Sequence, residues 1–363
     1  HAIGTNAGLK RARADQKYAD LKYIMRRFVT RDAVRNAIRG VVNEIFKVRQ
    51  VHIWGEGTTS CAADSKKFGS WDQNLMTEWH SRYGGRGVMI YWHVEKNSTC
   101  IYSQLKRCSS SEVEAMIEGV LQHCTAMSVD KAYVDSHGQS EVAFAFSFLL
   151  GFQLLPRLKG IRREKLNSPG PRKAGDYPNL QAIMDKAINW QLIKEQYDEM
   201  VKCAVAIKTR TADAEAILRR FTNDNLSHPT YKAFIELGRV LKTIFLCKYL
   251  GSEALRREIH EGLNVIENWN SVNGFIHFGQ NGKILSNNIE DQELSMLCLH
   301  LLQVSLIYVN TLMLQEVLSE PDWSERMTTA DWRGLNPLGH AHVTYGNFDC
   351  NMKKRIKLKA KAA

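Results

Sequence analysis

The sequence lacks closely spaced cysteines. The chain has 363 residues and eight cysteines, and no C-x-x-C pair occurs among them. Such pairs are typical of structural zinc sites and redox dithiols, so their absence argues against both. Scattered cysteines are typical of an intracellular protein that keeps its thiols reduced. The eight are Cys61, Cys100, Cys108, Cys124, Cys203, Cys247, Cys298 and Cys350.

The sequence also lacks a long apolar run and an excess of acid. No apolar run approaches the roughly 18 residues that cross a bilayer, and no signal peptide precedes the core, which argues against a membrane protein. The 49 Lys and Arg residues exceed the 38 Asp and Glu residues, which gives a net charge of +11. That excess favours a polyanionic partner, nucleic acid first and an anionic membrane surface second.

A regular succession of strand and helix patterns is present. Three β-rich runs come first and predict an antiparallel meander, and a helix, a strand, a second helix and a further strand follow. Because parallel strands need helical crossovers, this order predicts an α/β fold with a ribonuclease-H-like core of the retroviral-integrase type. The expected strands cover residues 58–63, 87–95, 98–105, 131–135 and 152–158, and the expected helices cover 109–124 and 140–151.

The composition changes after Leu158 and divides the chain. Residues 157–173 carry seven basic residues against one acid and include Ser-Pro-Gly-Pro, which predicts a loop. Helical periodicity beyond it predicts a large all-helical insertion between the fifth strand and the rest of the core. The expected parts are a basic helical lead-in (1–50), the first part of the core (51–160), the insertion (161–251), the second part of the core (252–320) and a basic C-terminal extension (321–363).

Both ends of the chain carry their own signals. The chain starts at His1 without a methionine, in a helical sequence, and we expect it to be the end of a longer polypeptide. Residues 351–363 contain six basic residues and no acid. Such a run is as typical of a solvated disordered tail as of a DNA contact.

Two aspartates stand at the ends of expected strands. Asp135 directly follows the short apolar strand that ends at Val134, and Asp64 ends the first β-rich run. A single aspartate there commonly satisfies only the backbone of a turn. In the predicted core, however, the first and fourth strands are neighbours, so the two carboxylates would lie side by side.

A third carboxylate, Glu267, belongs to a predicted helix near the end of the core. Apolar residues at spacings of four, four and three form one buried face of this helix, and Glu267 lies on or beside it. A carboxylate aimed toward a core is costly unless it is paired or binds a cation. An ion pair with Arg239 or Lys208 is the simple alternative.

Taken together, Asp64, Asp135 and Glu267 would converge at one edge of the sheet. Converging carboxylates repel one another unless cations lie between them, and hard oxygen ligands with room for substrate phosphates suit Mg²⁺. Two such ions about 4 Å apart assist in-line displacement at phosphorus. The sequence therefore predicts a site for Mg²⁺, with Mn²⁺ as a substitute and with two ions bound.

At these residues the sequence resembles the transposases of the Tn3 family. Its matching stretches, in the family's order, are "WGEGTTSCAADSKKF", "RYGGRGVMIYWHV", "AYVDSHGQSEVAFAFSFLLGFQLLPRLKGI", "AIKTR", "ELGRVLKTIFLCKYL", "LRREIHEGLNVIEN" and "LNPLGHAHV". They cover nearly the whole chain. The chain departs from the family pattern at residues 136–137, where threonine and alanine are usual, and on both sides of Glu267, at 265–266 and 268–269.

The resemblance implies that Asp64, Asp135 and Glu267 are the family's acidic DDE triad. The implied activity is a metal-dependent transposase: water cleaves the DNA at each transposon end, and the freed 3′ hydroxyl attacks target DNA in replicative transposition. The implied partners are transposon-end and target DNA and a second copy of the chain, because two ends must be brought together. The implied setting is the bacterial cytoplasm, associated with the nucleoid.

Basic side chains near the expected site are candidates for DNA contact. Phosphate contacts from such residues position DNA, although an ordinary solvated surface is an equally good interpretation of each. A histidine in a turn is more often only a turn residue. The candidates are Lys66, Lys67, Arg82, Arg86, His137, Lys208 and Arg210.

Two other functions compete with the transposase hypothesis. The first is a stand-alone ribonuclease-H-like nuclease, which the long insertion disfavours. The second is a degenerate or domesticated fragment that grips DNA through its basic surface without chemistry. The intact acidic triad favours the enzyme hypotheses.

Overall fold

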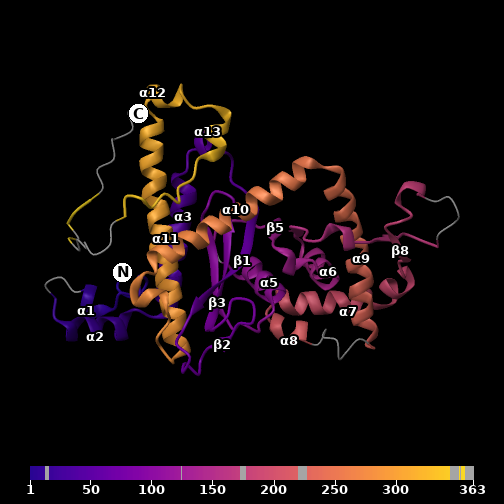
Figure 1. Cartoon of the computed structure of the whole chain (residues 1–363), viewed down its shortest axis with the longest axis horizontal. Helices are drawn as coiled ribbons and strands as arrows, with labels where there is room; N and C mark the ends of the chain where they lie inside the picture. Colours follow the sequence, from indigo (N-terminus) through magenta and orange to yellow (C-terminus); the bar gives the residue numbers. More distant parts are fainter. Residues whose placement is uncertain are drawn as a thin grey trace.

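The computed structural model describes residues 1–12, 16–123, 125–171, 177–219, 227–343, 351 and 353–355. Most of the basic tail at 351–363, as well as Cys124 and Cys350, therefore lies outside the described residues. The N-terminal helices and the last long helix lie at one end of the molecule, and the insertion lies at the other (Figure 1). The six described cysteines are free thiols, so no disulfide occurs among them.

A mixed sheet forms the centre and confirms the expected α/β class. Its strands run in the order β2-β3-β1-β5-β6, with β4 pairing β3. Pairing is antiparallel among β1, β2, β3 and β4 and parallel from β1 to β5 and from β5 to β6. The strands are β1 Ser60–Gly69, β2 Glu78–Trp79, β3 Arg86–Glu95, β4 Cys100–Lys106, β5 Lys131–Val134 and β6 Gln153–Pro156.

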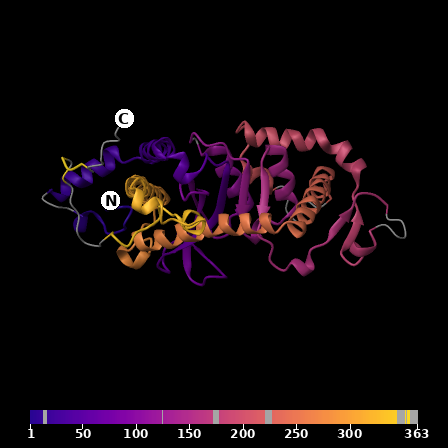
Figure 2. The same ribbon diagram turned by 90° about the horizontal axis from the view of Figure 1, so that it is seen from above.

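Helices cover both faces of this sheet. Adjacent residues of a strand point to opposite faces. Trp92 of β3 contacts Trp269 and His300, whereas its neighbour His93 is bonded to the carbonyl of Met116. Helices α10 (Glu253–Ile276) and α11 (Ile289–Leu318) therefore cover one face, and α5 (Glu112–Gln122) covers the other. Figure 2 shows α10, in orange, running along one side of the sheet.

Local capping explains where the core helices begin. The side chain of Ser111 accepts a hydrogen bond from the amide of Glu114 at the start of α5. Ser140 caps α6 (Glu141–Leu150) in the same way, and Gly151 ends that helix with a φ of 91°. Glycine suits this position because other residues are strained there.

Helix α11 is more apolar than the sequence analysis indicated, since no apolar run was expected to be long enough to cross a bilayer. By length and composition it could cross a membrane, although no uninterrupted apolar run suggests this. Half of its most apolar window is buried inside the protein, where the helix packs against α3 (Arg31–Val48) and β4. We interpret it as a core helix, since it carries several buried polar side chains. These include Gln292, His300, Gln303, Asn310 and Gln315.

Residues 161–251, which were expected to form an all-helical insertion, also contain two strands. Strands β7 (Leu166–Ser168) and β8 (Met184–Ala187) form a small parallel sheet ahead of the helices α7, α8 and α9. The amide of Asn167 donates to the hydroxyl of Thr243, 3.0 Å away, which attaches this sheet to α9. Because Asn167 and Thr243 are far apart in the sequence, no local pattern predicts this contact. The three helices are Trp190–Lys208, Ala214–Arg219 and Pro229–Gly251.

The remaining elements are short and lie mainly at the two ends of the described chain. The α-helices are α1 Leu9–Ala12, α2 Tyr18–Phe28, α4 Val51–Trp54, α12 Pro321–Ser324 and α13 Thr329–Gly334. The 3₁₀ helices are η1 Ser136–Gly138, η2 Ile161–Arg163, η3 Pro178–Leu180 and η5 Gly279–Gly282.

Candidate active site

Strand pairing brings the two aspartates together. Ala63 of β1 pairs in parallel with Val134 of β5, so the next residues, Asp64 and Asp135, are neighbours across two strands about 4.8 Å apart. The expectation that Asp64 ends its strand is wrong, because β1 continues to Gly69 by pairing with β3. Asp135, as expected, directly follows its strand.

Helix α10 carries Glu267 to the same place. Its apolar face is buried through Ile259, Leu263 and Ile266, and the helix approaches the sheet closely at Gly262. A Cβ atom at this glycine would lie only 2.5 Å from the Tyr133 ring of β5. The absence of a side chain at position 262 therefore lets α10 cross strand β5 at short range.

One pocket of about 200 Å³ contains all three acids. It is lined by side chains from β1, α5, α10 and the segments after β5 and β6. Its lining is Asp64, Ser65, Arg82, Tyr83, Glu112, Asp135, Arg157, Lys159, Leu263, Ile266 and Glu267.

Asp64 is the most perturbed of the three acids. Burial, and to a smaller extent the negative charges of Glu112, Asp135 and Glu267, together raise its pKa to about 7, against a hydrogen bond from the amide of Ser65 that lowers it. The side-chain amide of Asn270 donates to Asp64 Oδ2 at 3.4 Å. The other end of that amide, Oδ1 of Asn270, is buried without a partner among the described residues.

Asp135 and Glu267 are paired with basic side chains. Arg157 bridges the two carboxylates at 3.4 Å and 3.3 Å, and Lys159 Nζ lies 2.8 Å from Asp135 Oδ2. Burial alone would raise the pKa of Asp135, but the hydrogen bond and charge of Lys159 and the charge of Arg157 lower it below its usual value. The alternative considered for Glu267, an ion pair with Arg239 or Lys208, is not what the structure has: Glu267 pairs with Arg157, and Arg239 pairs with Glu236.

Glu112 is a fourth carboxylate that the sequence analysis missed. It occupies the first turn of α5, and its Oε1 accepts a hydrogen bond from Ser65 Oγ at 2.9 Å. The available signal was its position at the start of a helix that follows the meander, although an acid in a first helical turn is also ordinary. Arg157 and Lys159 were missed as well, and both directly follow β6 at the edge where Asp135 lies.

The donor chemistry of this pocket fits a hard divalent cation. Carboxylate oxygens dominate it, Asp64 is held in a desolvated position, and the side-chain oxygen Oδ1 of Asn270 has no partner in the described part of the chain. The carboxylates are not gathered tightly, since no cluster of three or more His, Cys, Asp or Glu suited to a metal occurs among the described residues. Arg157 and Lys159 instead lie against two of the acids.

The candidate DNA contacts are placed differently from one another. Arg82 lines the acid pocket. Lys66 Nζ donates to the carbonyl of Asn270, and burial lowers its pKa to about 8. Lys67 donates to the carbonyl of Gly85 at 2.8 Å.

Of the candidates with described side chains, Lys66, Lys67, Arg86, Lys208 and Arg210 are not among the residues that line the pocket. Arg86 donates to the carbonyl of Thr77 at 2.7 Å, which joins β3 to the segment before β2. Lys208 ends α7, and both it and Arg210 are exposed at this helix end. The backbone of His137 lies in η1 beside Asp135, and its side chain lies outside the described structure.

Comparison with known proteins identifies similar sequences. A family model described as the Tn3 transposase DDE domain matches residues 1–348. The transposase for transposon Tn1546 of Enterococcus faecium is 28% identical over 98% of this chain and 36% of its own length. The transposase for transposon Tn501 of Pseudomonas aeruginosa is 25% identical over 94% of this chain and 34% of its own length. The chain thus spans about a third of the length of these curated relatives.

Proposed function

Because this chain belongs to the Tn3 transposase DDE domain family, we propose that it is the catalytic part of a transposase. In this proposal it cleaves DNA at transposon ends and joins the resulting 3′ hydroxyls to target DNA. The observation that carries the proposal is the convergence of Asp64, Asp135 and Glu267 in one pocket at the sheet edge. The names of the relatives support transposition as the process, and the three acids suit chemistry at phosphorus.

The sheet supports the assignment of a ribonuclease-H-like core. Two antiparallel pairings, β4 with β3 and β3 with β1, are followed by two parallel pairings, β1 with β5 and β5 with β6, which gives the order β4-β3-β1-β5-β6. The proposed core covers residues 51–160 and 252–320, and the proposed insertion covers 161–251. Asp64 and Asp135 lie on the neighbouring strands β1 and β5 or directly after them, and the pocket that they line gives a substrate access to both carboxylates.

The three acids would hold Mg²⁺, and Asn270 would orient Asp64 through its amide. When bound, divalent ions activate the attacking oxygen and stabilise the leaving one. Occupation of the site requires Asp64 to be ionised, and the pKa of about 7 makes this group the last of the pocket's perturbed acids to lose its proton. Glu112 holds Ser65 beside Asp64.

Arg157 and Lys159 have a second role in this proposal. Their side chains pair with Asp135 and Glu267, and they are partly exposed at the mouth of the pocket. If the carboxylates held a cation, Arg157 and Lys159 would be free to leave them. They then lie beside the site, where Lys and Arg contacts to phosphate position a DNA strand without reading its sequence. Arg82 borders the pocket and would act in the same way.

The test is cleavage of a labelled transposon-end duplex with Mg²⁺ or Mn²⁺, carried out in the full-length protein. Asp135→Asn removes one charge from the pocket and should abolish nicking while DNA binding persists. Asp130→Asn is the matched control, since Asp130 is an exposed acid beside the opposite end of β5. Equal nicking by both variants would overturn the assignment of the triad. Binding without nicking in the unaltered protein would instead favour a DNA-binding module.

The same proposal implies an assembly of two copies. Two transposon ends must meet before strand transfer, so each would be held by one protomer. Measurement of molar mass by light scattering, with and without paired end duplexes, tests this directly. A complex that contains one protein copy and two ends would contradict it.

A further inference from the structure

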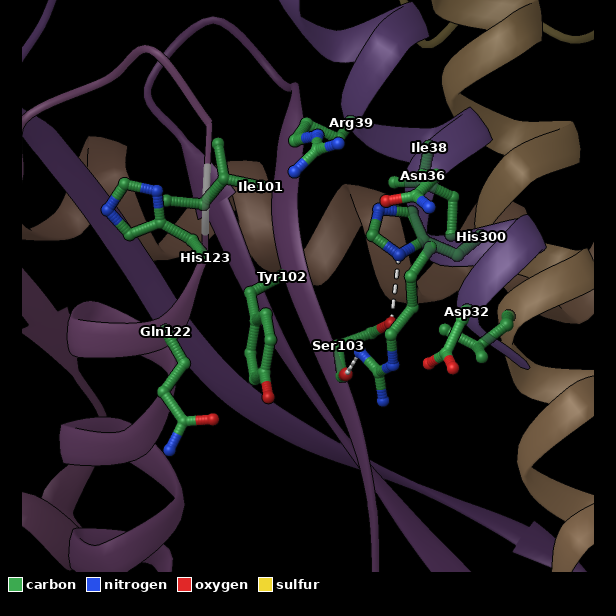
Figure 3. A pocket seen from close by; sticks show the side chains of 12 residues that line it. Asp32, Asn36, Ile38, Arg39, Ile101, Tyr102, Ser103, Gln122, His123 and His300 are labelled. Atoms are coloured by element: carbon green, nitrogen blue, oxygen red, sulfur yellow. Dashed lines mark hydrogen bonds between the residues drawn. The ribbon is translucent and has the colours of Figure 1, made fainter. Parts of the chain in front are cut away.

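A second pocket, of about 340 Å³, lies outside the acid pocket at the β4 edge of the sheet. It is enclosed by α3, β4, the end of α5 and α11 (Figure 3). Its size falls within the range of small-ligand sites. None of its lining residues takes part in the proposed chemistry.

The lining separates into an apolar part and a polar part. Ile38, Ile101 and Leu297 are buried and provide an apolar floor. The Tyr102 ring lines the pocket beside them, between Gln122 on one side and Ser103 on the other (Figure 3). An apolar floor with an aromatic ring suits a planar base, since every base has a face that stacks.

The polar groups are arranged to hold an anion at one end. Arg39 makes no hydrogen bond or ion pair with any residue that the structure describes, and its side chain is exposed at the pocket. Figure 3 shows it above Ile101, while Asp32 lies at the far side of the pocket. Arg35 is already used, because it pairs with Glu293 at 2.8 Å and lies over one face of the Tyr102 ring, 5.5 Å from its centre, so a base would stack on the other face. A guanidinium without a partner among the described residues, in the same pocket as an aromatic ring, suits a phosphate attached to a base.

We propose that this pocket binds one nucleotide unit, with its base against Tyr102 and its phosphate at Arg39. Gln122 supplies an amide that can pair with the edge of a base. Only the source of the nucleotide rests on the proposed function, since a transposase would present a DNA strand.

The sheet register favours a strand as that source. Ser103 pairs with Trp92, and Trp92 pairs with Asp64. These residues therefore lie at one level across three neighbouring strands, and two steps of about 4.8 Å place the backbone of Ser103 about 10 Å from that of Asp64. The buried Trp92, Trp269 and His300 lie between these two positions, so a strand that occupied both pockets would run around this cluster and not across it.

The test measures binding of a labelled single-stranded oligonucleotide by fluorescence anisotropy in EDTA, so it does not depend on catalysis. Tyr102→Leu removes the ring and Arg39→Glu reverses the charge. We expect each to weaken binding about 10-fold, in line with the loss of one stacked base. Tyr102→Phe retains the ring and should bind as the unaltered chain does.

Two controls isolate the pocket. Arg27→Glu makes the same charge change on α2, at an exposed residue outside the pocket, and should change affinity less than 2-fold at fixed salt. An oligonucleotide with abasic sites should bind the unaltered chain and Tyr102→Leu equally. Oligonucleotides with 5-iododeoxyuridine should cross-link under ultraviolet light to the peptide that contains Tyr102.

The outcomes separate this proposal from the catalytic one. Competition by free deoxynucleoside monophosphate would identify a nucleotide pocket that does not need a strand, whereas competition by oligonucleotide alone would identify a strand subsite. Equal affinity of Arg39→Glu and Arg27→Glu, or cross-links only at other peptides, would overturn the proposal even if nicking occurs. If Tyr102→Leu fails to fold, the proposal is still tested by Arg39→Glu, a change at an exposed residue, and by the position of the cross-link. Loss of nicking in Asp135→Asn leaves these binding results unchanged.

Discussion

Replacement of Asp64 by asparagine should stabilise the metal-free protein at neutral and alkaline pH. In the folded chain, burial and the neighbouring acids raise the pKa of Asp64 from 3.8 to about 7. The folded state therefore holds this proton more tightly than the unfolded state. The stabilisation that comes from this tighter proton binding is fully present below about pH 4 and is lost as the pH rises from about 4 to about 7.

The magnitude follows from the shift. Each pKa unit corresponds to about 1.4 kcal/mol, so ionising Asp64 in the folded protein costs about 4 kcal/mol above pH 7. Asparagine has the same shape, can still accept from the Ser65 amide and carries no charge. Asp64→Asn should therefore raise the free energy of unfolding by up to about 4 kcal/mol at pH 8, and by little at pH 4.

Urea unfolding in EDTA across pH 4 to 8, followed by tryptophan fluorescence, measures this difference. Asp130→Asn serves as the control, because its side chain is exposed and lies outside the acid pocket. A second series with Mg²⁺ should narrow the gap, since a bound cation stabilises only the chain that retains the carboxylate. A difference between Asp64→Asn and the unaltered chain that stays constant with pH would refute the reasoning.

Three further perturbations address other parts of the site. Gly262→Ala should lower the free energy of unfolding by about 1–3 kcal/mol in urea titrations, because its Cβ would meet the Tyr133 ring. Gly40→Ala is the control: no atom lies within 4 Å of the added Cβ, so this change should raise the free energy of unfolding by about 0.5–1 kcal/mol. Arg157→Ala should tighten Mn²⁺ binding several-fold in paramagnetic resonance titrations, because it frees two carboxylates; unchanged affinity would contradict its competition with the cation. DNA affinity of the chain should fall steeply as salt rises from 50 to 200 mM, and a flat response would argue against phosphate contacts.

The sequence predicts those parts of the fold that local patterns determine. The order of the core strands and helices and the α/β class follow from periodicity and end signals. The polar residues after Asp64 suggest that the strand ends there, yet β1 continues because it pairs with β3 up to Gly69. The β7–β8 sheet depends on contacts with α9 that are distant in sequence, so no pattern near Leu166 indicates it.

The candidate site follows the same division. The three acids are visible in the sequence because two follow or lie in apolar strands and one lies beside a helical stripe. Arg157 and Lys159 are not, since their relevance depends on β6 lying next to β5 and thus on the parallel register that places them beside Asp135. Charge alone does not distinguish them from the other basic residues of the loop.

The residues that follow Glu267 give α10 its importance. Trp269 is fully buried against Trp92 and His300, so it anchors the helix to the sheet. Asn270, the next residue, reaches Asp64, while Glu267 faces the pocket one turn earlier. One rigid helix therefore positions both an acid and the partner of another acid. His300 also contributes to the wall of the second pocket, so the same aromatic cluster lies between the two proposed sites.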